Sequence, residues 1–170
     1  MEPDSPENNE RQSITTAADI IRAHGRDSVV IPQGFLEGEN SKNGGFLKGA
    51  GFTTDSSIGH FIILTDAIHW TSTELRNFIF DRTKRGSIEP STAVRAQIAE
   101  RQTSLQALRD VRKEIGRDIF GEDLDKYTLE VENRFRNGPT GDSPTIREKK
   151  RTWYREFGND IRDHFPLTSK

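Results

Sequence analysis

The feature that most constrains the fold is the one strongly apolar run in the chain, Phe61-Ile62-Ile63-Leu64. It lies inside the stretch 59–70, which reads GHFIILTDAIHW. Short apolar runs that contain β-branched residues are typical of buried strands. The sequence therefore predicts a strand over residues 59–65, around which the rest of the chain is organised.

Apolar side chains are scarce in this chain of 170 residues. Hydrophobic residues make up 31% of it, and the 14 glycines bring the total only to about 39%, against roughly 45–50% in a typical globular domain. A chain of this length is expected to form one domain, which we place at residues 13–170. We expect a small core, a large solvated surface and a protein partner, or a second copy, that covers part of this surface.

The first 65 residues predict a tail, a short helix and a small sheet. Residues 1–12 hold two prolines and no apolar side chain after Met1, which predicts a disordered tail. A short helix is expected to end before Gly25. Residues 28–31 are followed by Pro32, which favours an edge strand. The motif GFLEG at 34–38 recurs as GFLKG at 45–49 around an Asn-Gly pair, a hairpin signal.

Residues 72–168 are helical in pattern. The clearest helix is expected over residues 91–120, because its apolar residues recur at steps of three, four and seven. These positions are Val94, Ile98, Leu105, Leu108, Val111, Ile115 and Ile119. Arginines at two heptad positions argue against a continuous coiled coil. Further helices are expected from residue 72 to about 85, from 124 to about 136, and from 144 onward, where Ser143-Pro144 is a start signal.

The predicted fold class is therefore α+β. A small antiparallel sheet, with a glycine-rich hairpin, occupies residues 28–65 in the N-terminal third. A predominantly helical part occupies residues 72–168, and the short linker between its last two helices favours an antiparallel pair.

Two basic clusters suggest nucleic acid as an alternative partner. They are Arg82, Lys84 and Arg85, and then Arg147, Lys149, Lys150 and Arg151, which precede Trp153 and Tyr154. Basic residues beside aromatic ones suit phosphate contacts combined with base stacking. The competing interpretation is that the aromatic residues form the buried face of the last helix and the basic residues its solvated face. Helical spacing favours the competing interpretation, and a nucleic-acid interface would require the two clusters to share one face.

A third hypothesis is a metal- or phosphate-dependent enzyme around His60, Asp66 and His69. Imidazoles and a carboxylate are suitable metal ligands, but on a strand His60 would lie far from Asp66. The chain has no cysteine, which excludes thiolate ligands and disulfides. The glycine-rich run 44–51 lacks the order of a phosphate-binding loop. We therefore expect no metal and no cofactor, and we find no coherent catalytic set of residues.

The leading hypothesis is a non-catalytic binding or assembly protein that acts through its long amphipathic helices. Val94 and Ile119, near the ends of the longest helix, are the candidate contacts with a partner. Residues 1–10 show no secretory signal, and no apolar run approaches the roughly 20 residues that span a bilayer. We therefore expect no membrane partner and a soluble, intracellular (cytoplasmic) protein.

Overall fold

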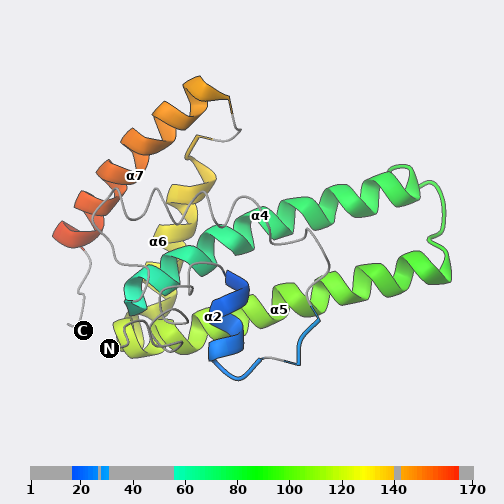
Figure 1. Cartoon of the computed structure of the whole chain (residues 1–170), viewed down its shortest axis with the longest axis horizontal. Coiled ribbons are helices and arrows are strands. Elements are labelled where there is room, and N and C mark those ends of the chain that lie inside the picture. Colours follow the sequence, from blue (N-terminus) through cyan, green and yellow to red (C-terminus); the bar gives the residue numbers. More distant parts are fainter. Residues whose placement is uncertain (1–16, 27, 31–55, 140–142, 165–170) are drawn as a thin grey trace, which may run out of the picture.

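The computed structural model describes residues 17–26, 28–30, 56–139 and 143–164, and all regular secondary structure within them is helical. The elements are α2 (Ala17–Ala23), α4 (Ser57–Thr83), α5 (Thr92–Phe120), the 3-10 turn η1 (Gly121–Asp123), α6 (Leu124–Arg136) and α7 (Pro144–His164). Figure 1 shows α4 and α5 side by side as a long antiparallel hairpin, with α2, α6 and α7 gathered at one end of it.

The predicted α+β class is wrong for the part of the chain that the structure describes. The run expected to form a strand at residues 59–65 lies inside α4, and the helix expected from residue 72 is the second half of the same helix. Residues 28–30 form no strand either. The predicted hairpin at 34–49 and the predicted tail at 1–12 lie outside the described residues.

Capping and burial explain why the apolar run is helical. The Ser56 hydroxyl accepts a hydrogen bond from the Gly59 N–H at 3.0 Å, which fixes the helix start. Every residue from Phe61 to Ile68 is buried. A helix that is covered on all sides carries no apolar stripe, so its sequence has no helical period to recognise. The threonines add to this ambiguity, but Thr65 and Thr71 each donate their hydroxyl to the carbonyl four residues earlier, as helical threonines can.

The core forms where the first half of α4 meets the second half of α5. The Phe61 and Phe120 rings pack edge to face with centroids 5.3 Å apart. Gly116 of α5 permits this approach, because a Cβ atom there would lie 3.0 Å from the Phe61 ring and 2.4 Å from the Leu124 side chain. Ile20 and Ile21 of α2 and Val131 of α6 complete the core and are fully buried.

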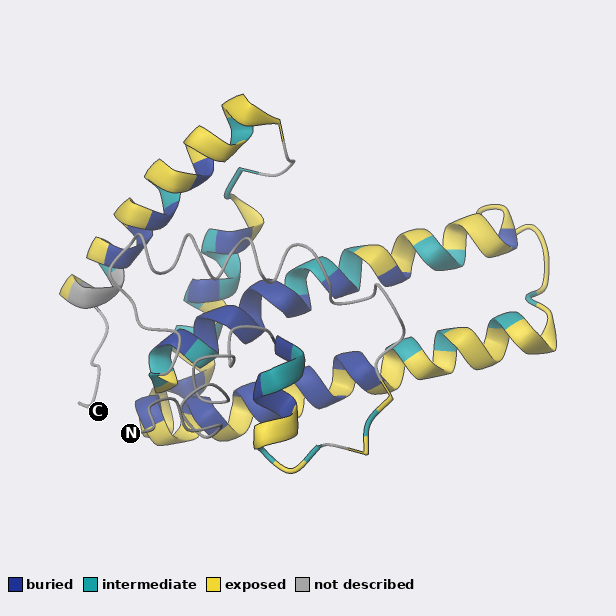
Figure 2. Ribbon diagram, in the orientation of Figure 1, coloured by how far each residue is buried: buried dark blue, intermediate teal, exposed yellow. Residues whose placement is uncertain are grey.

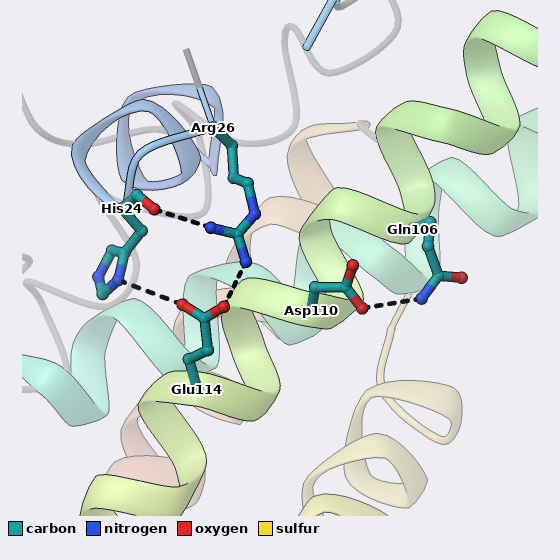
Figure 3. Close-up of polar contacts among 5 residues, drawn as sticks. All are labelled: His24, Arg26, Gln106, Asp110 and Glu114. Carbon is teal, nitrogen blue, oxygen red and sulfur yellow. Dashed lines mark hydrogen bonds and ion pairs between the residues drawn. The ribbon is translucent and has the colours of Figure 1, made fainter. Parts of the chain in front are cut away.

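An ion-pair cluster lies where the turn after α2 meets α5. Figure 3 shows the Glu114 carboxylate of α5 facing both Arg26 and His24. Arg26 forms an ion pair with Glu114 and also donates to the His24 carbonyl at 3.0 Å. The three side chains are partly exposed, so the cluster orients the turn more than it stabilises the fold.

Three of the four helices predicted for the C-terminal part, α5, α6 and α7, are confirmed and begin at or within a residue of the expected positions. The hydroxyl of Ser91 accepts from Val94 N–H at 3.2 Å and starts α5, and Ser143 accepts from Ile146 N–H at 3.2 Å at the start of α7. α7 packs on α6 through an aromatic cluster of Phe135, Trp153, Tyr154 and Phe157. Among the described helices, none is long and apolar enough to cross a membrane.

The distal halves of α4 and α5 project away from the core, and we call residues 74–103 the arm. Within the arm only Leu75 and Thr83 are buried, and Ile79 and Ile98 are half-buried between the two helices. Figure 2 shows the change from dark, buried surface at the core to mostly exposed surface along the arm. α4 has 27 residues and therefore extends about 40 Å, much of it outside the core.

Leu105 tests the boundary between the core and the arm. Its side chain is 5% exposed and belongs to the core, so Leu105→Ala should lower the free energy of unfolding by about 2–5 kcal/mol. Leu129, which is 55% exposed, is the matched control, and Leu129→Ala should change it by less than about 0.5 kcal/mol. Urea unfolding followed by circular dichroism measures both. Equal stability of the two variants would contradict the packing described here.

Candidate functional site

The end of the arm carries exposed aromatic and basic side chains, and we call residues 77–95 the arm tip. Phe78 lies between two guanidinium groups, with Arg82 at 4.6 Å and Arg101 at 4.1 Å from its ring centroid. Cation–π contacts of this kind shield an aromatic ring from water where no apolar core covers it. Phe80, in contrast, is 50% exposed, and Ile88 is exposed as well.

The arm tip is basic. Residues 77–95 contain Arg82, Lys84, Arg85 and Arg95 against Asp81 and Glu89, a net charge of +2. Arg95 pairs with Glu89 at 3.2 Å. The side chains of Lys84 and Arg85 make no hydrogen bond or ion pair with the described residues, and with Phe80 they line a surface hollow of about 690 Å³.

The turn at the arm tip has an unusual backbone. Lys84 and Arg85 have φ angles of 49° and 61°, in the left-handed region, and are followed by Gly86 at 87°. A left-handed conformation costs a residue with a side chain roughly 1–2 kcal/mol. Thr83 holds the turn, because its carbonyl accepts from the N–H groups of Gly86 at 3.1 Å and Ile88 at 3.0 Å.

A second surface, the α6–α7 groove, is acidic. It encloses about 740 Å³, and its lining contains the carboxylates of Glu130, Glu156, Asp160 and Asp163 and the rings of Trp153 and Phe157. Arg134 is the one basic residue among the described lining residues and forms an ion pair with Asp160, so the lining carries a net charge of −3. The Trp153 and Phe157 rings are stacked, with centroids 5.0 Å apart.

The structure does not bring the two predicted basic clusters together. Arg82, Lys84 and Arg85 lie at the arm tip, whereas Arg147, Lys149, Lys150 and Arg151 lie in the first half of α7, which Figure 1 shows well away from the arm tip. Within the second cluster Lys150 is buried beside Asp66, where both line a cavity of about 20 Å³. Arg151 is paired with Glu148, and Arg147 and Lys149 are exposed.

The two predicted interface residues lie in different environments. Val94 is half-buried in the first turn of α5, within the arm tip. Ile119 is 6% exposed and belongs to the core, so its side chain is not accessible to a partner in this structure. The sequence stripe does not distinguish the two positions, because both lie on the same face of α5.

His60, Asp66 and His69 all lie on α4. Asp66 and His69 are three residues apart and therefore share a helix face, whereas His60 is nearly two turns away from Asp66. Asp66 is buried beside Lys150. In the part of the chain that the structure describes, no three histidine, aspartate or glutamate side chains are arranged to hold a metal ion.

His69 belongs to a different site, a basic cleft that the sequence did not reveal. This cleft encloses about 450 Å³ between α4, α5 and α6, and its lining includes Ser72, Arg76, Arg109 and Arg136. Burial lowers the pKa of His69, and the charges of Arg136 and Arg76 lower it further. The arginines are about 30 residues apart in sequence, so only their positions on packed helix faces bring them together.

A buried ion pair lies beside the basic cleft. Arg112 is 8% exposed, and its guanidinium contacts the Glu132 carboxylate at 2.8 Å. Its Nη1 also lies 3.5 Å from the Thr65 hydroxyl. Burial lowers the pKa of Arg112, whereas the neighbouring Glu132 raises it. The carboxylate therefore compensates a cation that α5 carries into the core.

Removing the partner of Arg112 should destabilise the fold. Glu132→Gln leaves the buried cation without a counter-charge. We expect the free energy of unfolding, measured by thermal or urea unfolding, to fall by roughly 3 kcal/mol. Glu130→Gln, on the same helix, is the matched control and should have little effect. The double variant Arg112→Met with Glu132→Gln should recover most of the loss, because it removes both charges. A Glu132→Gln variant as stable as the control would contradict this role.

Comparison with protein-family models, with curated protein sequences and with solved structures finds no match to this chain.

Proposed function

We propose that the chain is a non-catalytic assembly protein that binds to copies of itself. In this proposal the arm tip of one copy docks into the α6–α7 groove of the next. The observation that carries the proposal is that one chain has a projecting basic surface with an exposed aromatic ring and, elsewhere, an acidic groove lined by aromatic rings.

Charge complementarity supports this pairing. The arm tip carries a net charge of +2 and the lining of the α6–α7 groove a net charge of −3. Opposite potentials accelerate association and select the partner, and like charges disfavour contacts between two tips or two grooves. The cations of Lys84 and Arg85 have no carboxylate partner among the described residues and would gain one in the groove.

Aromatic side chains supply the apolar part of the contact. Phe80 is half-exposed at the arm tip, and the half-buried Trp153, stacked on the buried Phe157, lines the groove. Large aromatic residues at the centre of an interface carry a disproportionate share of binding energy, and surrounding polar contacts exclude water. The left-handed backbone at Lys84 and Arg85 supports the same proposal, because local strain is often retained where it presents side chains to a partner.

The geometry of this contact determines the kind of assembly. The arm tip and the α6–α7 groove are different surfaces, so the contact is heterologous and each added copy leaves one tip and one groove open. Such contacts produce closed rings or open chains, not a simple two-fold dimer. The molecular mass should therefore rise with concentration through species larger than two copies.

A nucleic-acid partner has less support. The two basic clusters lie on separate parts of the molecule, one at the arm tip and one on α7, and Lys150 is buried. A continuous basic stripe along one face is the usual electrostatic footprint of nucleic-acid binding. We therefore do not put nucleic-acid binding forward as the function.

Charge reversal on each surface tests self-assembly. Lys84→Glu with Arg85→Glu reverses the arm tip, and Glu156→Lys with Asp163→Lys reverses the groove. Each double variant alone should remain a monomer by light scattering at concentrations where the wild type assembles, because like charges then face one another. An equimolar mixture of the two should assemble again with the variants alternating, since the acidic tip of one fits the basic groove of the other and the unreversed tip and groove remain complementary.

The control for this experiment is Lys113→Glu with Arg117→Glu, an equal charge change on exposed positions of α5 outside both surfaces. It should assemble as the wild type does. Circular dichroism establishes that all variants are folded. A wild-type protein that stays monomeric up to hundreds of micromolar would overturn the proposal, and so would two reversed variants that do not combine when mixed.

A further inference from the structure

Three arginines from three different helices line the basic cleft at the base of the arm. Arg76 comes from α4, Arg109 from α5 and Arg136 from α6. The cleft lies where the three helices meet, and its volume of about 450 Å³ falls in the range of small-molecule sites, roughly 300–1,000 Å³. Its lining shares no residue with the lining of the α6–α7 groove, although both surfaces include residues of α6.

No carboxylate among the described residues pairs with these three arginines. In the described part of the chain, the side chains of Arg76 and Arg109 make no hydrogen bond or ion pair, and Arg136 donates to the neutral amide oxygen of Asn133 at 2.6 Å. Glu132 is the one carboxylate among the described lining residues, and it is engaged by the buried Arg112 at 2.8 Å. The cleft therefore keeps an excess positive charge.

Helix stability does not explain all three positions. Arg136 is in the last turn of α6, where a cation interacts favourably with the helix macrodipole. Arg76 and Arg109 are in the middle of α4 and α5, where this effect is absent. Like charges that converge on one cleft repel one another, and a bound anion would remove this repulsion.

The neighbouring polar groups are suited to an anion. The hydroxyl of Ser72 makes no hydrogen bond with the described residues and is available to donate. Thr73 already donates to the His69 carbonyl at 3.1 Å. His69 is held neutral at neutral pH, because its pKa is lowered by burial and by Arg136 and Arg76, and a neutral imidazole still offers one N–H donor.

We propose that the basic cleft binds a small molecule through a phosphate group, which Arg76, Arg109 and Arg136 hold and to which Ser72 donates. The planar guanidinium fork matches phosphate oxygens, with two parallel hydrogen bonds for each arginine. Ile68 is the only large aliphatic side chain in the described lining, and His69 is its only aromatic ring. The cleft therefore has little surface on which to stack a nucleobase, and the ligand is a compact, highly polar phosphate compound.

The first experiment measures thermal stability of the full chain in pyrophosphate, inorganic phosphate, citrate and chloride at one ionic strength. Ligand that binds only the folded state stabilises it by mass action, so the melting temperature should rise by roughly 5 °C at pyrophosphate concentrations a hundred times the Kd. Inorganic phosphate should act at higher concentrations. Citrate should act more weakly than pyrophosphate, because its carboxylates are not tetrahedral.

Variants in the cleft locate the binding. Arg76→Gln and Arg109→Gln should each weaken pyrophosphate binding about tenfold by calorimetry, since each removes a charge-assisted pair of hydrogen bonds. Arg109→Lys keeps the charge but loses the fork and should weaken binding several-fold. Arg117→Gln makes the same charge change at an exposed position of α5 outside the cleft, and its affinity should equal that of the wild type.

Three results would overturn the proposal. One is an equal melting temperature in pyrophosphate and in chloride. Another is Arg76→Gln and Arg109→Gln variants that are folded by circular dichroism and bind as tightly as the wild type. The third is an Arg117→Gln variant that loses as much affinity as they do, which would reveal a general charge effect. None of these variants alters the arm tip or the α6–α7 groove, so failure here leaves self-assembly to be tested by its own variants.

Discussion

Complete burial of the apolar segment 61–68 of α4 is the constraint on which the rest of the structure depends. A helix covered on all sides needs neighbours on all sides, and this chain has few apolar residues to supply them. α5 covers one face with Leu108 and Val111, α2 adds Ile20 and Ile21, and α6 adds Val131. The positions of α2, α5 and α6 around α4 follow from this requirement.

The shortage of apolar residues also explains why α4 and α5 each have one half in the core and the other half in the arm. Once the apolar residues are used at the core, the arm is left with a few half-buried apolar residues, such as Ile79 and Ile98, and with arginines that cover Phe78. Basic and aromatic side chains at the arm tip are thus the remainder of a thin core, and they are also the side chains that would form the interface we propose. The basic cleft lies at the transition, where Arg76 and Arg109 emerge from the last packed turns.

The sequence predicts helices well where one face is apolar and the caps are explicit. Ser91, Ser143 and Gly121 mark boundaries that the structure confirms, and Leu105 and Leu108 lie in the core as their stripe indicates. It fails at residues 59–65, because a fully buried run has no period and its isoleucines and threonine favour a strand. Hydrogen bonds from the threonine hydroxyls and packing on every side outweigh that local preference.

The candidate sites were harder to predict, because they depend on how helix faces meet. Lys150 lies in a run of basic residues, yet it is buried beside Asp66 on another helix. Ile119 and Val94 share one stripe, but only Ile119 is covered by the core. No local sequence pattern relates Arg76, Arg109 and Arg136. They come together only because α4, α5 and α6 pack in one particular register.

The continuity of α4 has a consequence for local unfolding. One uninterrupted ladder of backbone hydrogen bonds passes from the core into the arm, while the packing that protects it falls sharply at about residue 74. Opening free energies follow packing and not helicity, so the two halves of a single helix form separate cooperative units. Amide hydrogens before that point should exchange only with global unfolding, and those beyond it through fraying of the hairpin. A partner at the distal end would then be visible as slowed exchange confined to the outer turns, in a helix whose inner turns are already protected.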